Sequence, residues 1–121
     1  MMLLPVFLGG GIGASLRYGI SLFVVNRMDG NLGLATLLSN VIAAVIMGVT
    51  LFLIEEKMQE TAWIRSFILI GFCGGLSTFS TFSYETVLFL KSGNLWLALG
   101  NVVLSAAICI AILYPFIRVP Q

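Results

Sequence analysis

The sequence contains no histidine, few charged residues and only two cysteines. Charged side chains account for 9% of the 121 residues, whereas soluble domains carry roughly 25%. Histidine is the commonest general acid or base, and the two lysines, Lys57 and Lys91, lie in loops between apolar segments. The composition therefore argues against an enzyme. A net charge of +1 gives no electrostatic basis for binding nucleic acid.

The two cysteines, Cys73 and Cys109, both fall inside apolar segments. Two thiols give little support to a disulfide framework or a zinc site, so we interpret them as small buried side chains. The apolar N-terminus has no basic region ahead of it. We therefore expect Met1–Val25 to be a retained first membrane span rather than a cleaved signal peptide.

Hydrophobic residues make up 60% of the chain and gather in four long segments. A bilayer core of about 30 Å is crossed by about 20 helical residues, and each segment is long enough. The sequence therefore predicts an all-α integral membrane protein, with residues 1–121 forming one domain of four transmembrane helices. The expected spans are approximately Leu3–Val25, Leu34–Ile54, Ile64–Leu90 and Leu95–Ile117.

The third segment has an unusual centre, Gly71–Ser83. These thirteen residues include three Gly, three Ser, two Thr and three Phe. Glycine is a poor helix former, and hydroxyl side chains compete with the backbone for hydrogen bonds. We therefore predict that the third helix is broken at mid-membrane. A broken helix in lipid must be buried in protein or line a polar cavity, so this stretch is the first candidate for a functional site.

Arg17 and Glu85 are charged residues within predicted spans. A charged residue in a span is a functional hypothesis by default. Arg17 lies close enough to the end of its span to reach the headgroups, and it is equally suited to an aqueous vestibule that attracts anions. Glu85 is the only acidic residue within a span. It could accept a hydrogen bond, carry a proton or face a water-filled mouth.

Polar residues also occur in the second and fourth spans. Thr36 and Asn40 are four residues apart and share a helix face. An amide in a membrane helix commonly joins two helices, but it can also donate its N–H to an anion. Asn101 and Ser105 form a similar pair, which we interpret as an interhelical contact.

Small residues recur at helical spacing in two pairs, Gly9 with Gly13 and Ala44 with Gly48. Such pairs allow helix backbones to approach closely in lipid, and we take them to favour a homodimer. Residues 9–14 also fit the G-x-G-x-x-A dinucleotide pattern, but that pattern requires a preceding strand. Here it lies within a span, so helix packing is the favoured interpretation.

The basic residues give almost no preference for one orientation in the membrane. With four spans, Lys57, Arg65 and Arg118 lie on one side, while Arg27 and Lys91 lie on the other, with Arg17 nearer the second side. Few charges make such a count noisy. A balanced count is equally expected of a protein whose copies insert in both directions, which is dual topology.

Phe79 and Phe82 are three residues apart, with the hydroxyl residues Ser80 and Thr81 between them. If a helix resumes near Phe79, the two rings share a face. Plain packing is the simplest interpretation of the spacing. However, an aromatic ring has a positive edge, so ring edges together with hydroxyl and amide donors could surround a small desolvated anion.

Three motifs together resemble the bacterial fluoride channels, the Fluc or CrcB family, along the whole chain. The first is Gly71–Ser83 followed by Glu85; the second is Gly9–Gly13 with Arg17. The third is Ala35–Asn40, which is similar to the family pattern G-T-L-x-x-N. Ala35 stands where the family usually has Gly, and Ser39 stands where Val or Ala is common.

This resemblance implies an antiparallel, dual-topology homodimer with two pores, located in the bacterial inner membrane. The residues that match the fluoride pore are Asn40, Phe79, Phe82, Ser80 and Thr81. Arg17 and Glu85 match vestibule residues near the pore ends. Gly74 and Ser77 match the positions whose backbone carbonyls hold a structural Na⁺ at the dimer interface. Freed carbonyls of a broken helix are suitable ligands for such a cation.

The function implied by the resemblance is passive, selective export of fluoride from the cytoplasm, which protects the cell from fluoride toxicity. The alternative from the residues is a small four-helix, dual-topology drug exporter that couples transport to protons. Such an exporter needs an essential acid near mid-membrane, whereas Glu85 is off-centre. The substitution Glu85→Gln distinguishes the two, since an antiporter would lose its coupling and a channel can still conduct.

Overall fold

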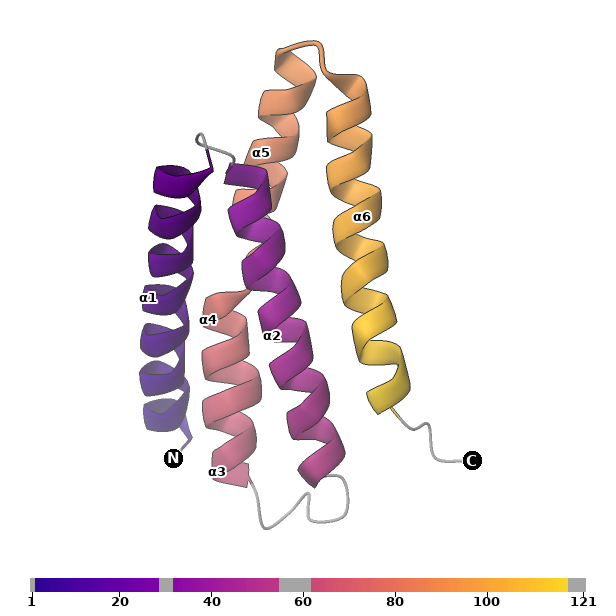
Figure 1. The fold of residues 1–121 in the computed structure, drawn as a ribbon. Coiled ribbons are helices and arrows are strands. Elements are labelled where there is room, and N and C mark those ends of the chain that lie inside the picture. Colours follow the sequence, from indigo (N-terminus) through magenta and orange to yellow (C-terminus); the bar gives the residue numbers. More distant parts are fainter. Residues whose placement is uncertain (1, 29–31, 55–61, 118–121) are drawn as a thin grey trace.

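The computed structural model describes residues 2–28, 32–54 and 62–117, and every regular element in these ranges is helical. Two long helices come first, α1 (Leu3–Arg27) and α2 (Leu32–Ile54). A continuous helical run follows, made of α3 (Ala62–Ile64), the π-helix η2 (Arg65–Cys73) and α4 (Gly74–Leu76). The remaining elements are α5 (Phe79–Lys91), α6 (Leu95–Leu113) and the 3₁₀ turn η3 (Tyr114–Phe116). Figure 1 shows their order along the chain.

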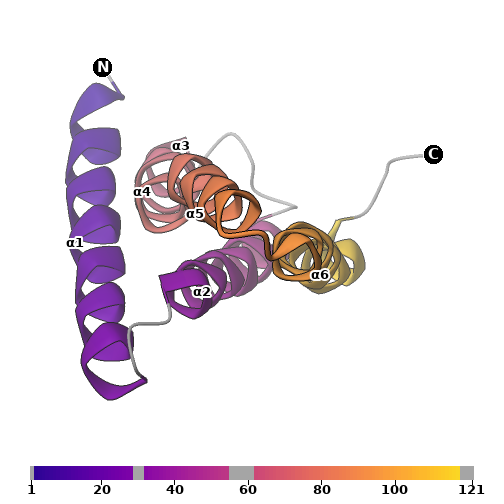
Figure 2. The same cartoon turned by 90° about the horizontal axis from the view of Figure 1, so that it is seen from above.

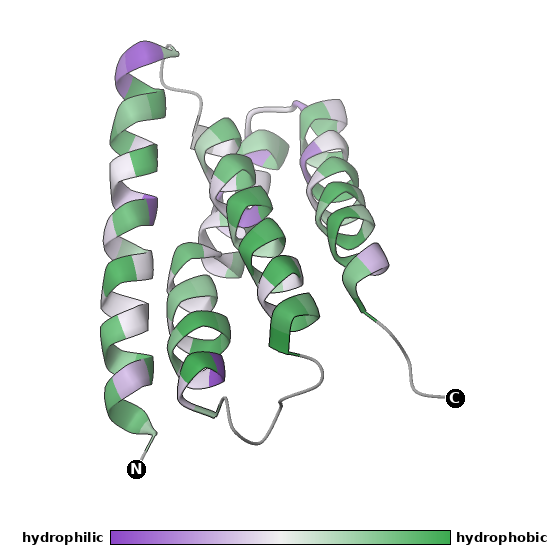
Figure 3. Ribbon diagram, turned by 60° about the horizontal axis from the view of Figure 1, so that its bottom comes forward, coloured by the Kyte–Doolittle hydropathy of each residue, from purple (hydrophilic) through white to green (hydrophobic). Residues whose placement is uncertain are grey.

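Four helical segments are long and apolar enough to cross a membrane: Leu3–Arg27, Gly33–Ile54, Ala62–Lys91 and Leu95–Phe116. The predicted all-α chain with four such segments is confirmed. Figure 3 shows that hydrophobic residues predominate along the helices and that strongly hydrophilic ones are few. Many large apolar side chains are exposed on the single chain, as expected of helices that face lipid or another subunit. The charged run Glu55–Glu60 lies outside the described residues.

The helices are arranged in layers, with α1 and α6 on the outside and the other helices between them (Figure 2). Helix α1 packs mainly against η2 and α4, while α6 packs against α2 and α5. Seen from above, α1 and α6 lie on opposite sides of the central helices (Figure 2). Helices α5 and α6 are joined by a tight turn in which Gly93 has a φ of 78°. In that turn the Asn94 N–H donates to the Phe89 carbonyl at 2.9 Å. Gly93 therefore ends the helix with the left-handed conformation that glycine adopts readily.

The contact between α1 and the η2–α4 run is made by backbone on backbone. A Cβ added to Gly9 would overlap the carbonyl oxygen of Phe67, and one added to Gly13 would overlap that of Phe72. From the other side, a Cβ on Gly75 would overlap the Gly10 carbonyl oxygen. Gly9 and Gly13 of α1 thus serve close helix packing, as expected in membrane bundles.

The second small-residue pair also packs within the chain. A Cβ on Gly48 would overlap the ring of Phe116, which lies edge-on to Phe52 with ring centroids 6.5 Å apart. Ala44 is buried in the single chain. From the sequence, both small-residue pairs favour a homodimer. In the structure, the glycines contact residues of the same chain and Ala44 is already buried within it, so the pairs give no support to that inference.

Candidate functional site

The helical run ending with α4 and the start of α5 are separated by Ser77 and Thr78. Ser77 has φ −75° and ψ 155°, and Thr78 has φ −152° and ψ 125°, so both have extended backbone. Two extended residues between two helices remove hydrogen bonds that a continuous helix would make. The freed backbone groups need other partners, and these define the site.

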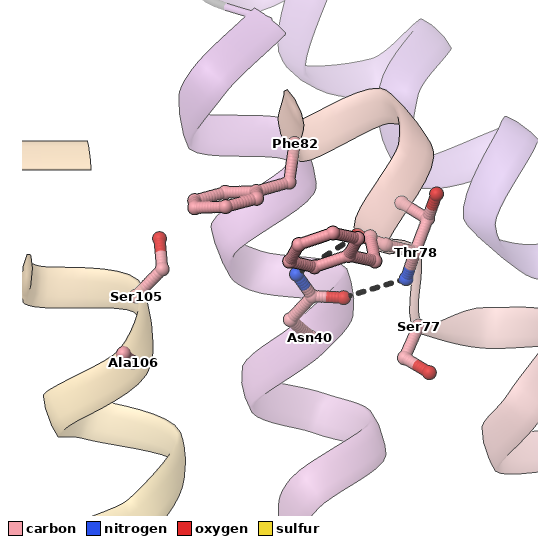
Figure 4. A pocket seen from close by; sticks show the side chains of 7 residues that line it. Asn40, Ser77, Thr78, Phe82, Ser105 and Ala106 are labelled. Carbon is pink, nitrogen blue, oxygen red and sulfur yellow. Dashed lines mark hydrogen bonds between the residues drawn. The ribbon is translucent and has the colours of Figure 1, made fainter. Parts of the chain in front are cut away.

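Asn40 of α2 supplies two of those partners (Figure 4). The Thr78 N–H donates to Asn40 Oδ1 at 2.8 Å, and Asn40 Nδ2 donates to the Thr78 carbonyl at 3.4 Å. One side-chain amide therefore pairs with both backbone groups of Thr78. Asn40 joins two helices, and it also lines the neighbouring pocket.

Thr78 is the N-cap of α5. Its hydroxyl oxygen accepts from the Thr81 N–H at 3.3 Å, which satisfies one of the free donors at the start of the helix. The same hydroxyl donates to Thr81 Oγ1 at 3.1 Å and lies 3.3 Å from Ser80 Oγ. Three hydroxyls are thus linked at the first turn of α5.

A pocket of about 280 Å³ opens beside this turn (Figure 4). The residues that line it come from α2, the extended segment, α5 and α6: Asn40, Ser77, Thr78, Phe79, Phe82, Ser105 and Ala106. The Phe79 and Phe82 ring centroids are 5.6 Å apart with planes tilted by 36°. Phe79 is 80% exposed on the single chain, so the pocket is not closed on that side.

A second pocket of about 210 Å³ contains the cationic residue Arg17. It is lined by Ala14, Arg17, Tyr18, Ser21, Thr36, Thr78 and Thr81. Arg17 Nε donates to the Gly75 carbonyl at 3.2 Å, and this contact holds the guanidinium beside the end of α4. Thr78 lines both pockets.

Glu85 is buried rather than facing a mouth of the single chain, with only 2% of its surface exposed. Thr36 Oγ1 donates to Glu85 Oε1 at 2.5 Å. Among the described residues, Glu85 Oε2 has no hydrogen-bond partner. Since Thr36 lines the Arg17 pocket, its hydroxyl connects that pocket to the buried carboxyl group.

The structure brings some of the candidate residues together and separates others. Asn40, Phe79 and Phe82 share the first pocket, whereas Thr81 and Arg17 share the second. The residues lining these two pockets do not include Ser80, which instead lies against the Thr78 hydroxyl.

Three residues of the first pocket are not among the sequence candidates, the polar Thr78 and Ser105 and the apolar Ala106. Thr78 carried a signal, because threonine immediately before a helix is a common N-cap. Ser105 had been interpreted only as an interhelical contact together with Asn101. For Asn101 that interpretation is confirmed, since its Nδ2 donates to Thr86 Oγ1 of α5 at 3.0 Å.

The backbone at Gly74 and Ser77 is suited to holding a cation. In an unbroken helix, the Gly74 carbonyl would accept from the Thr78 N–H and the Ser77 carbonyl from the Thr81 N–H. Here those two N–H groups donate to Asn40 Oδ1 and Thr78 Oγ1 instead. Carbonyl oxygens are good ligands for hard cations. No cluster of three or more acidic, histidine or cysteine side chains capable of holding a metal occurs in the described ranges.

The Asn40 contact predicts a specific loss of stability. We expect Asn40→Ala to lower the free energy of unfolding by about 1 to 3 kcal/mol, because the backbone groups of Thr78 lose their partners. Asn94→Ala is the matched control, since the Asn94 amide donates only to exposed Ser92 Oγ, at 3.1 Å. Denaturant unfolding in detergent measures both. Equal effects of the two substitutions would contradict this role.

The amino-acid sequence is similar to known proteins along nearly the whole chain. Residues 4–115 match the family described as "CrcB-like protein, Camphor Resistance (CrcB)". A "Fluoride-specific ion channel FluC" of Clostridium perfringens is 41% identical over 108 residues, which cover 87% of this chain and 82% of the relative. Proteins of the same name from Coxiella burnetii and Shewanella halifaxensis are each 39% identical. These alignments cover 92% and 90% of this chain, and 90% and 87% of the relatives.

Proposed function

The chain belongs to the CrcB-like family, and from this premise we propose that it is a fluoride-specific ion channel that exports fluoride passively from the cytoplasm. The observation that carries the proposal is the identity of 39 to 41%, over most of the chain, with relatives named as fluoride-specific channels. In acid surroundings hydrogen fluoride crosses lipid and ionises inside the cell. A passive pathway lets the trapped anion leave, which protects against fluoride toxicity.

The first pocket offers the chemistry that a desolvated fluoride ion needs. Fluoride is small and strongly hydrated, so a narrow path must replace its water with hydrogen-bond donors and positive ring edges. In this pocket we assign that role to Asn40, Phe79 and Phe82. Ser80 and Thr81 are assigned as hydroxyl donors beside it, with Thr81 in the Arg17 pocket. Among the residues that the structure describes, no charged side chain lines this pocket, so these residues do not hold an anion there by a fixed cation.

Arg17 and Glu85 are assigned to the approaches of the pathway. Arg17 lines the second pocket, called here the Arg17 pocket, and the first pocket, lined by Phe79 and Phe82, is called the phenylalanine pocket. Thr78 lines both pockets. The positive charge of Arg17 attracts anions. Glu85 accepts a hydrogen bond from Thr36, which lines the Arg17 pocket. Chloride is larger than fluoride, and we expect it to be excluded by the width of the path.

We further propose that the functional unit is an antiparallel, dual-topology homodimer in the bacterial inner membrane, with the third span broken at mid-membrane. The extended backbone of Ser77 and Thr78 supports the break. The balanced basic residues support dual topology. The exposure of Phe79 supports a second copy, because one chain leaves that side of its pocket open.

The carbonyl groups of Gly74 and Ser77 fit a structural Na⁺ at the dimer interface. In a homodimer, each subunit would present these two oxygens from the end of its broken helix. The ion would supply positive charge to acceptors that lack their helical donors. Its role would be assembly, separate from the path of the anion.

Efflux from reconstituted vesicles tests the proposed function. Vesicles loaded with equal fluoride and chloride, with a potassium ionophore to balance charge, are expected to release fluoride and retain chloride. Ion-selective electrodes follow both anions, and vesicles without protein are the control. Absence of fluoride release, or equal release of chloride, would contradict the proposal.

A further inference from the structure

Thr78 lies where the two pockets meet, and its hydroxyl has three polar neighbours. Thr78 lines both the phenylalanine pocket and the Arg17 pocket. Its hydroxyl oxygen contacts the Thr81 N–H, Thr81 Oγ1 and Ser80 Oγ at 3.1 to 3.3 Å. Asn40 fixes its backbone on both sides.

The hydrogen-bonding capacity of this hydroxyl is fully used. A threonine hydroxyl carries one hydrogen and two lone pairs. The hydrogen goes to Thr81 Oγ1, and one lone pair accepts from the Thr81 N–H. The contact with Ser80 Oγ must then be a bond that Ser80 donates. Thr78 therefore has no hydrogen left to offer an anion.

Ser80 and Thr81 differ in whether their hydroxyl hydrogen is already used in a hydrogen bond. The hydrogen of Ser80 is directed at Thr78, whereas Thr81 accepts from Thr78 and keeps its own hydroxyl hydrogen. Thr81 also lines the Arg17 pocket. Its hydrogen is thus available on the side where the positive charge lies.

We propose that Thr78 is a positioning residue of the anion path, which acts by orienting the Thr81 hydroxyl as a hydrogen-bond donor to a small anion in the Arg17 pocket. This inference rests on the proposed channel function. Thr78 itself does not touch the anion through its hydroxyl. Of the hydroxyls in the first turn of α5, Thr81 is the donor and Ser80 is the weaker contributor.

Isosteric replacement tests the role of the Thr78 hydroxyl. Valine suits the extended backbone at this position, so Thr78→Val removes the hydroxyl with little change of shape. We expect fluoride efflux from vesicles to fall about tenfold, the scale of one lost hydrogen bond to a charged group. Thr78→Ser keeps the hydroxyl and is expected to restore efflux to within about twofold of the original chain. If valine leaves efflux unchanged, or serine is as impaired as valine, the proposal is wrong.

Thr50→Val is the matched control. The Thr50 hydroxyl donates to the Ile46 carbonyl of its own helix at 2.7 Å, and neither pocket is lined by it. We expect its efflux to equal that of the original chain. A loss as large as that of Thr78→Val would mean that any missing hydroxyl impairs the protein, and would overturn the proposal.

A double substitution distinguishes positioning from a merely structural contribution. If Thr78 acts through Thr81, then Thr78→Val combined with Thr81→Val should conduct no less than Thr81→Val alone, since coupled residues are not additive. A multiplicative loss of about a hundredfold overturns the inference.

A comparison that leaves Thr78 intact gives an independent check. Thr81→Val is expected to reduce efflux more than Ser80→Ala, and the reverse order also overturns the inference. If the unsubstituted chain releases no fluoride, the proposed channel function is wrong. If the unsubstituted chain conducts but Ser80→Ala reduces efflux more than Thr81→Val, only the inference about Thr78 is wrong.

Discussion

Gly13→Ala is expected to destabilise the folded chain by about 3 kcal/mol, at the upper end of the cost of overpacking. The added methyl group would overlap the Phe72 carbonyl oxygen and press on the Leu76 N–H. These are backbone atoms of η2 and α4, so they cannot rotate away as the end of a side chain could. Helix α1 would have to separate from the run that leads to the extended residues. Denaturant unfolding in detergent, with the elution profile of the purified protein, measures the effect.

Gly11→Ala is the control on the same helix with the same change. A Cβ on Gly11 has no neighbouring atom within 4 Å. Alanine favours a helix over glycine by about 1 kcal/mol, so we expect this variant to be as stable as the original chain or slightly more so. Equal destabilisation by the two substitutions would show that glycine flexibility, and not close packing, is required in α1.

Phe82→Ile is expected to reduce fluoride flux by about a hundredfold while the protein still folds and assembles, and Phe79→Ile is expected to act in the same direction. The change removes an aromatic ring that lines the pocket beside Asn40 and replaces it with an aliphatic group that has no positive edge. A hundredfold loss of flux corresponds to about 2.7 kcal/mol in the barrier to conduction, since each 1.36 kcal/mol is a factor of ten.

Phe23→Ile is the matched control for the rings. Phe23 lies on α1 and is 65% exposed, with Arg27 over its ring at 6.0 Å. We expect normal flux from this variant. Fluoride and chloride efflux from vesicles should be recorded with the elution profile for all three variants. Unchanged flux in both Phe79→Ile and Phe82→Ile would return the two rings to a packing role.

The large-scale features of this fold can be predicted because they depend on local composition. Four apolar segments of sufficient length specify four helices able to cross a membrane. The stretch of Gly, Ser and Thr around residues 71–83 signals weak helix formation, and Ser77 and Thr78, the extended residues, lie within it. The Gly9 and Gly13 spacing indicates a close backbone contact, although not which helix is the partner.

The details of the site depend on tertiary contacts that no local pattern contains. Phe82 and Thr81 are neighbours in sequence, but successive residues of a helix point roughly 100° apart. They therefore line different pockets. Asn40 pairs with Thr78 across 38 positions, and Thr36 pairs with Glu85 across 49. Those pairings follow from how α2 packs on α5, so the sequence offers candidates for the residues but not their partners.

The π-helix η2 was also not predicted, since nine residues are too few to show a distinctive spacing. Its geometry is visible in the contact with α1. Gly9 and Gly13, four residues apart, lie against Phe67 and Phe72, which are five apart. Ser66 and Gly71, also five apart, are both buried. A π-helical hydrogen bond spans five residues, one more than an α-helical hydrogen bond, which matches the two spacings.

The length of η2 is consequently under a stricter constraint than its composition. Deleting one residue from 65–73 would have one of two effects. If a π turn tightens to an α turn, the five-residue spacing that lies against Gly9 and Gly13 is lost. If the π turns persist, everything that follows rotates by roughly 100°, and the Gly75 contact with α1 and the pairing of Thr78 with Asn40 are lost together.

Substitutions that keep the apolar character of η2 should be tolerated there, except at Gly71, where a Cβ would overlap the Val6 carbonyl oxygen of α1. In an alignment of relatives, insertions and deletions should be absent between Arg65 and Thr78 and should gather in the connections between spans.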